Sequence, residues 1–132
     1  MNWGRIGLAG VAAGVVAWLV SFVLHGVIMA GTYAKYPVFI QEDGNPFWFL
    51  LVGVCIGVPY AILFAKTRKC WGSGLAAGAT FGFVVGLVLF FQDFYLPLVV
   101  VGFPYYLGWC WGGINLIVSV VYGAVVGLLY KE

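Results

Sequence analysis

The feature that most constrains this chain is a set of four apolar blocks, each about twenty residues or longer. They cover residues 6–29, 46–65, 73–92 and 107–130. Each block can cross a hydrocarbon core of about 30 Å as a helix that rises about 1.5 Å per residue. The alternating pattern that is typical of a membrane β-barrel is absent. The sequence therefore predicts an all-α membrane protein, a four-transmembrane-helix bundle in one domain over residues 1–132.

Composition supports this class and excludes others. The chain is 64% hydrophobic and 8% charged, and its mean hydropathy is +1.10, whereas soluble domains average about 25% charged residues. The expected surroundings are therefore a lipid bilayer. The formal charge is only +2, and the six basic residues are scattered, so no nucleic-acid partner is expected.

The basic residues predict an orientation. In a four-span arrangement, five of the six lie on one side: Arg5, Lys66, Arg68, Lys69 and Lys131. Lys35 lies on the other side with Glu42 and Asp43. Because Lys and Arg concentrate on the cytoplasmic side of membrane proteins, we expect a multi-pass protein with both termini in the cytoplasm.

Glycines at four-residue spacing predict how the helices pack. Such GxxxG steps connect Gly74, Gly78, Gly82 and Gly86, and another connects Gly10 and Gly14. Helices in a bilayer associate by close backbone approach, which small residues allow. These glycines are expected to pack the protein's own helices as a glycine zipper. A seam between copies in an oligomer is the alternative.

The chain also shows a repeat pattern. A shift of 68 residues aligns residues 10–25 with residues 78–93, with identity at six of sixteen positions. Both segments end in an ionisable residue, His25 in the first and Asp93 in the second. The pattern predicts two tandem two-helix repeats related by an axis along the membrane normal.

Polar residues within the apolar blocks are candidates for a functional site. An ionisable group in a span costs free energy unless it is paired or near the interface. We therefore expect His25 and Asp93 to approach each other near the outer face, with Asn115 and Gln92 beside them. Alternatively, Asp93 only ends its helix at the interface, and His25 hydrogen-bonds to backbone or water. Asn115 is also a typical inter-helix hydrogen-bonding residue.

Cofactor and catalytic signals are sparse. His25 could ligate a haem or chlorophyll metal, with Gly26 leaving room for a macrocycle, but a bis-histidine haem would need a second chain. The three cysteines form neither a CxxC motif nor a Cys/His pair at metal spacing, so no metal site is expected. No nucleophile with a base and no phosphate loop is recognisable, so the sequence predicts no enzyme.

Two stretches carry a resemblance. The opening, MNWGRIGLAGVAAG, and a later segment, GFPYYLGWCWGGINLI, resemble small four-span bacterial membrane proteins to which no function is assigned. The resemblance covers most of the chain and implies the bacterial cytoplasmic membrane. It implies no activity, cofactor or site residue.

Two functions are compatible with these patterns. The first is a non-enzymatic subunit or scaffold of a larger membrane assembly, with a membrane-protein partner or as a homo-oligomer. The second is a small oligomeric channel or transporter with His25, Asp93 and Asn115 as its polar site. Transport should place polar groups at several depths. The cytoplasmic halves of the blocks are nearly free of them, which favours the first function.

Overall fold

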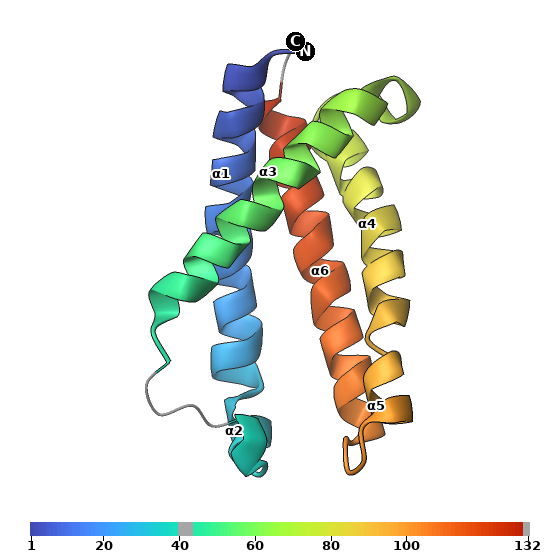
Figure 1. Ribbon diagram of the computed structural model, residues 1–132. Coiled ribbons are helices and arrows are strands. Elements are labelled where there is room, and N and C mark those ends of the chain that lie inside the picture. Colours follow the sequence, from blue (N-terminus) through green and yellow to red (C-terminus); the bar gives the residue numbers. More distant parts are fainter. Residues whose placement is uncertain (40–43, 131–132) are drawn as a thin grey trace.

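The computed structural model describes residues 1–39 and 44–130, and it confirms the predicted all-α four-helix bundle (Figure 1). The part of the chain that it describes contains no strand. The long helices are α1 (Trp3–Ser21), α3 (Pro46–Trp71), α4 (Leu75–Gln92) and α6 (Tyr105–Leu129). The first of them, α1, continues as the π-helical segment η1 (Phe22–Ile28). Four segments within the described residues are long and apolar enough to cross a membrane: Trp3–Ile28, Pro46–Trp71, Leu75–Val99 and Tyr105–Leu129. This is the architecture of a multi-pass membrane protein.

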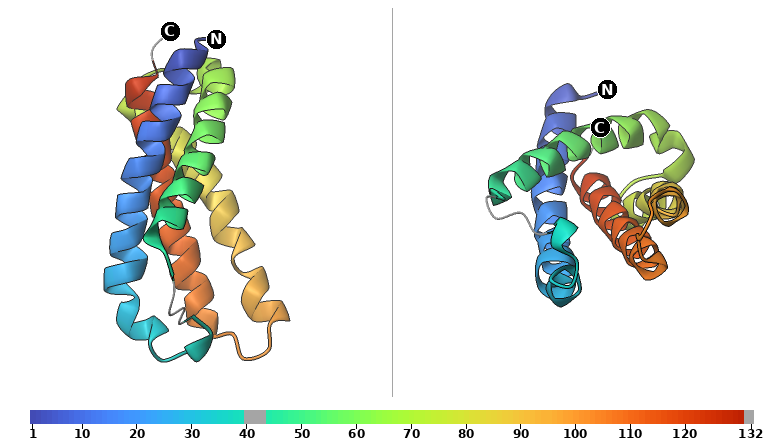
Figure 2. Two further views of the ribbon diagram at one scale, coloured as in Figure 1. Left: turned by 60° about the vertical axis from the view of Figure 1, so that its left-hand side comes forward. Right: turned by 60° about the horizontal axis from the view of Figure 1, so that its bottom comes forward.

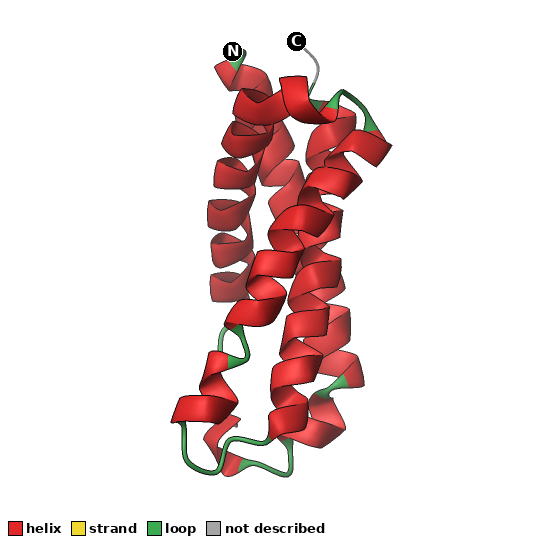
Figure 3. Ribbon diagram, turned by 90° about the vertical axis from the view of Figure 1, so that its right-hand side faces the viewer, coloured by secondary structure: helices red, strands yellow, loops and turns green. Residues whose placement is uncertain are grey.

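Short elements lie in two of the three connections. The first connection, between η1 and α3, contains α2 (Ala30–Tyr33) and the 3₁₀ turn η2 (Pro37–Phe39). The connection between α4 and α6 contains α5 (Tyr95–Val99), after which the chain turns at Gly102 with a φ of +81°. In Figure 3, most of the loop segments lie at the two ends of the bundle.

The bundle has two distinct ends. The start of α1, the end of α6 and the α3–α4 turn lie at one end, which we call the terminal end (Figures 1 and 2). The connections that contain α2 and α5 lie at the other, which we call the distal end. The terminal end carries the first turn of α1, with Arg5, and the last turns of α3, with Lys66, Arg68 and Lys69. Lys131, Glu42 and Asp43 lie outside the described residues.

The helices form two hairpins, α1–α3 and α4–α6, that make matching glycine contacts. A methyl group built on Gly57 of α3 would clash with the carbonyl oxygen of Gly10 on α1. In the same way, one built on Gly123 of α6 would clash with the carbonyl oxygen of Gly78 on α4. Only a hydrogen atom fits at such positions, so the paired backbones are in direct contact.

One helical turn further along, the glycine contacts of the two hairpins still correspond. Gly14 lies against the backbone of Val54 and Gly53, and Gly82 lies against that of Ser119 and Val120. The first helices of the two hairpins therefore correspond at the shift of 68 residues seen in the sequence, and the second helices correspond at a shift of 66. The tandem two-helix repeat is thus visible as a repeated packing arrangement.

Gly74 differs from the other glycines of its run. It precedes α4 as the N-cap residue and has a φ of +92°, while Gly72 of the same turn has a φ of +91°. Residues with a side chain rarely adopt such values. A methyl group built on Gly74 would meet nothing within 4 Å, so its missing side chain serves the tight α3–α4 turn, while its carbonyl oxygen would lie 2.5 Å from a methyl group built on Gly127 of α6.

Hydrogen bonds in the centre of the bundle connect the hairpins. The Ser119 hydroxyl donates to the carbonyl of Gly82 over 2.7 Å and lies 2.6 Å from the Tyr60 hydroxyl. The Tyr122 hydroxyl donates to the carbonyl of Gly53 over 2.9 Å. Because the Ser119 proton is used by Gly82, Tyr60 is the donor in its bond to Ser119. The central polar groups therefore have hydrogen-bond partners within the protein.

Candidate functional site in the open hairpin

The two hairpins differ in their distal halves. Figure 1 shows that α3 crosses α1 at a marked angle, whereas α4 and α6 run alongside each other. In the second hairpin, glycine contacts continue toward the distal end, where Gly86 lies against the backbone of Leu116 and Gly112 against Phe90. The first hairpin has no such continuation beyond Gly14 and Gly53, so its helices separate.

One residue explains the separation. The shift of 68 residues places Trp18 of α1 where α4 has Gly86. A methyl group on Gly86 would lie 3.0 Å from the Leu116 Cα atom, which leaves no space for an indole. Trp18 instead lies beside Gly53 of α3, with its Cβ 3.4 Å from a methyl group built there. We attribute the separation of α1 and α3 to this side chain, which stands where the other hairpin has a glycine.

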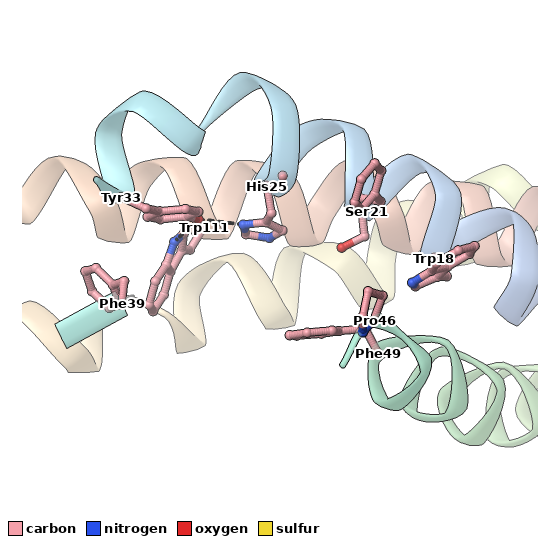
Figure 4. A pocket seen from close by; sticks show the side chains of 10 residues that line it. Trp18, Ser21, His25, Tyr33, Phe39, Pro46, Phe49 and Trp111 are labelled. Carbon is pink, nitrogen blue, oxygen red and sulfur yellow. Dashed lines mark hydrogen bonds between the residues drawn. The ribbon is translucent and has the colours of Figure 1, made fainter. Parts of the chain in front are cut away.

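A pocket of about 550 Å³ occupies the resulting space (Figure 4). Its walls come from α1 and η1, from the start of α3, from α2 and η2 in the first connection, and from α6. The lining residues are Trp18, Ser21, Phe22, His25, Gly26, Tyr33, Phe39, Pro46, Phe49 and Trp111. The pocket is mainly aromatic, with few polar groups directed into it, which is typical of small-molecule sites.

A hydrogen-bond chain holds His25 at the edge of this pocket. The Trp111 indole N–H donates to the Tyr33 oxygen over 2.7 Å. The Tyr33 oxygen lies 2.5 Å from Nδ1 of His25, and Figure 4 shows the imidazole directed into the pocket. Since an indole can only donate, the Tyr33 oxygen accepts from Trp111, and the phenol proton is available for Nδ1.

The protonated Tyr33 hydroxyl can select the tautomer of His25. Burial raises the pKa of the Tyr33 phenol, and the hydrogen bond from Trp111 offsets part of this effect. Tyr33 therefore keeps its proton at neutral pH and can donate it to His25. An imidazole that accepts at Nδ1 carries its own proton on Nε2. This arrangement presents one N–H donor to the pocket.

Ser21 supplies a second polar group. It lies four residues, or about one helical turn, before His25, and its hydroxyl points toward the same space (Figure 4). No residue in the described part of the chain forms a hydrogen bond with the Ser21 side chain. The hydroxyl and the His25 N–H are thus two donors on one wall, opposite Phe49 of α3.

An aromatic cluster closes the distal side of the pocket. The rings of Phe39, Trp111 and Phe103 lie within 5.3–6.3 Å of one another, in edge-to-face contact. Tyr33 joins the cluster through Phe39, at 5.6 Å. Such pairs are worth about 0.5–1.5 kcal/mol beyond the area that they bury. The cluster therefore fixes the first connection against α6 and positions Tyr33 for His25.

The predicted polar residues fall into separate groups. Asn115 of α6 donates its amide N–H to a carboxylate oxygen of Asp93 over 2.7 Å, which agrees with an inter-helix role for Asn115. No ion pair connects His25 and Asp93, both within the described ranges, although the Asp93 charge acts electrostatically on the imidazole. Gln92 is exposed at the end of α4 and belongs to neither group.

Sequence reasoning missed Ser21, Tyr33 and Trp111 as neighbours of His25. Tyr33 and Trp111 are 78 positions apart, and both read as interfacial aromatic residues. Ser21 carries a recognisable signal, because a serine one turn before a histidine in an apolar helix places two polar groups on one face. Only the fold of the first connection reveals the contact with Tyr33.

The pocket gives little support to a metal site. No group of three or more His, Cys, Asp or Glu side chains that could hold a metal ion occurs among the described residues. Beside Gly26, which lines the pocket, a methyl group would lie 3.3 Å from the Phe22 ring, so this ring borders the space that the sequence suggested for a macrocycle. His25 alone could supply one axial ligand.

Comparison with protein-family models, with curated proteins and with solved structures finds no match for this chain. The assignment of a function therefore depends on the geometry of the two hairpins and of the pocket between α1 and α3.

Proposed function

We propose that this protein is a non-enzymatic membrane subunit that holds an apolar small molecule between α1 and α3. The observation that carries the proposal is the pocket of about 550 Å³ in a hairpin whose other half is sealed by direct backbone contact. Leaving such a space in a helix pair forfeits packing, and an occupant that fills it would restore those contacts.

The exposure of the pocket walls supports access from the bilayer. Phe22 on η1 and Phe49 on α3 line the pocket, yet 52% and 67% of their surfaces are exposed. Both lie in segments that are apolar enough to span a membrane. The gap between these two residues would therefore open onto lipid, and a lipid-soluble ligand could enter without crossing water.

The alternative, an oligomeric channel or transporter based on His25, Asp93 and Asn115, has less support. A transport path needs polar groups that are free to bind the passing solute at several depths. The hydroxyls of Ser119, Tyr60 and Tyr122 in the bundle centre are occupied by each other and by backbone carbonyls. The glycine contacts also support internal packing, as opposed to a seam between copies.

We place the terminal end in the cytoplasm of a bacterial cell, because the basic residues of α1 and α3 lie there. The test uses Cys70, which is exposed near the end of α3, after Cys55 and Cys110 are replaced by alanine. An impermeant thiol reagent added to intact cells should not label Cys70. It should label Lys35→Cys in a variant that lacks Cys70. The reverse pattern would overturn the orientation.

A ligand-extraction experiment tests the function. The protein is purified natively in lipid nanodiscs, and bound small molecules are extracted and identified by mass spectrometry. Wild-type protein and a lipid-facing control, Val23→Phe, should retain the same compound, because Val23 is 48% exposed and is not among the residues that line this pocket. Ser21→Phe should fill the pocket and lose the compound. Equal retention by all three proteins, or by none, would contradict the proposal.

The same preparation addresses the assembly. A subunit should migrate with a larger membrane partner after mild extraction. If it instead forms only a homo-oligomer that conducts ions in vesicles, the transport function is favoured.

A further inference from the structure

We propose that the ligand is the head group of a lipid-soluble para-quinone, held by Ser21 and His25. This inference rests on the proposed function and names the class of molecule that the pocket takes. A para-quinone is a flat ring with two carbonyl oxygens on opposite sides and a long apolar tail. Each of these three features has a counterpart in the pocket.

The two donors match the two carbonyls. Ser21 and His25 are four residues apart, which corresponds to about 6 Å along a helix. Both side chains point into the pocket from the same wall (Figure 4). The oxygens of a para-quinone are separated by the width of one six-membered ring with its two C=O bonds, which is comparable with one helical turn. One molecule could therefore accept from both residues.

The hydrogen-bond chain allows His25 to act as a donor toward the pocket. With Trp111 donating to Tyr33, the phenol proton can be donated to Nδ1 of His25, and in that tautomer the free nitrogen Nε2 carries the proton. A carbonyl oxygen is an acceptor only, so it complements Nε2–H. Tyr33 and Trp111 thus act as positioning residues, because they orient the imidazole and select its tautomer without contact to the quinone carbonyl.

The walls match a flat ring. Phe49 faces Ser21 and His25 across the pocket, and Trp18 closes the side toward the bundle centre (Figure 4). Aromatic side chains favour offset-stacked or edge-to-face contact with another ring. The gap between Phe22 and Phe49 leads to lipid, where the tail of the ligand would remain.

Other lipid-soluble ligands fit less well. An acyl chain would leave the Ser21 hydroxyl and the His25 N–H without partners, which is unfavourable in an apolar site. An organic cation could use the aromatic walls, but no carboxylate of residues 1–39 or 44–130 lines the pocket. The pair of donors is therefore the feature that selects the quinone.

The test is a titration of nanodisc-embedded protein with a short-tailed ubiquinone analogue, followed by quenching of tryptophan fluorescence. Quenching should saturate in wild-type protein and in the lipid-facing control Val23→Ala. His25→Phe keeps an aromatic shape but removes the donor, so it should weaken binding roughly tenfold. Ser21→Ala should weaken it severalfold. An alkylbenzene of the same tail length, which lacks carbonyls, should displace the quinone poorly.

A second measurement does not depend on the folding of variants. The infrared carbonyl bands of a ¹³C-labelled quinone analogue should shift to lower frequency on binding to wild-type protein, because both oxygens accept hydrogen bonds. Unshifted bands, or equal displacement by the alkylbenzene with unchanged binding in His25→Phe, would overturn the quinone inference and leave the pocket function intact. If neither compound binds saturably and Ser21→Phe behaves as wild type, the proposed function fails as well.

Discussion

The two hairpins of this protein begin with the same glycine packing, but one stays closed along its length and the other opens. In α4–α6, close approach continues from Gly78 to Gly86 and on to Gly112, and the helices stay together. In α1–α3, it stops after Gly14, because Trp18 stands where the other hairpin has Gly86. A helix pair in a bilayer is held by backbone proximity, so one large residue is enough to turn a sealed contact into a cavity.

The polar residues at the distal ends show the same contrast. At the 68- and 66-residue shifts, Asp93 and Asn115 of the closed hairpin correspond to His25 and Phe49 of the open one. Asp93 reaches Asn115 directly. His25 faces a phenylalanine and shares a hydrogen bond with Tyr33, which the first connection brings back against α6. The closed hairpin satisfies its polar residue internally, whereas the open one keeps a donor available.

The largest expected effect comes from adding bulk where the hairpins match. Gly82→Leu places a branched side chain against the backbone of Ser119 and should lower the free energy of unfolding by roughly 3 kcal/mol or more. The corresponding substitution in the open hairpin, Gly14→Leu, should lower the free energy of unfolding by a similar amount. Val84→Leu, at a residue 43% exposed toward lipid, is the control and should change little. Thermal unfolding in detergent provides the measurement, and a small effect of Gly14→Leu alone would break the equivalence of the hairpins.

The second effect concerns the polar pair of the closed hairpin. Asn115→Ala leaves the half-buried Asp93 carboxylate without its amide partner and should destabilise the fold by about 2 kcal/mol. A double-mutant cycle with Asp93→Ala should show coupling between these residues. The cycle that joins Asp93 and His25 should show weaker coupling, because only a longer-range electrostatic effect connects them. Equal coupling in both cycles would restore the direct His25–Asp93 pair that the sequence suggests.

The third prediction tests whether Trp18 separates α1 and α3. Trp18→Gly gives the open hairpin the residue of the closed one, and α1 and α3 should approach each other in their distal halves. Spin labels on the lipid-facing residues Val23 and Phe47 should then report a shorter distance by pulsed electron resonance. The net change in stability should be small, roughly 1–2 kcal/mol, since glycine in a helix costs about 1 kcal/mol and closer packing offsets part of the loss.

Trp18→Phe is the matched variant, because it keeps a large ring at the same position. It should leave the distance between the labels nearly unchanged. If Trp18→Gly also leaves the distance unchanged, the splay of the hairpin has another cause, and the difference from Gly86 does not explain the pocket.

Sequence reasoning could predict the helices because span length and apolar character are local properties. It could also predict the glycine contacts in outline, since small residues at four-residue spacing have few other uses in a membrane. The site was harder to foresee. His25 was identifiable as an ionisable group in a span, but its partner depended on how Tyr33 folds back over Trp111, and no periodicity encodes the path of a connection. We attribute the pocket itself to Trp18, and the effect of this residue can be recognised only when it is compared with its counterpart, Gly86.

The smallest expected effect on stability is that of Tyr33→Phe, which tests whether His25 presents an N–H donor to the pocket. Tyr33→Phe removes one hydroxyl and should cost about 1 kcal/mol or less, because Phe keeps the ring contacts with Phe39 and Trp111. The informative signal is the tautomer. With Tyr33 present, ¹⁵N chemical shifts of His25 should show the proton on Nε2. In Tyr33→Phe, Nδ1 loses its donor, and the two tautomers should become mixed. Tyr36→Phe is the control, since the Tyr36 hydroxyl bonds to that of Tyr106 and not to the imidazole. A proton on Nδ1 in the wild-type protein would mean that His25 donates to Tyr33, and the pocket of the open hairpin would then present an acceptor in place of a donor.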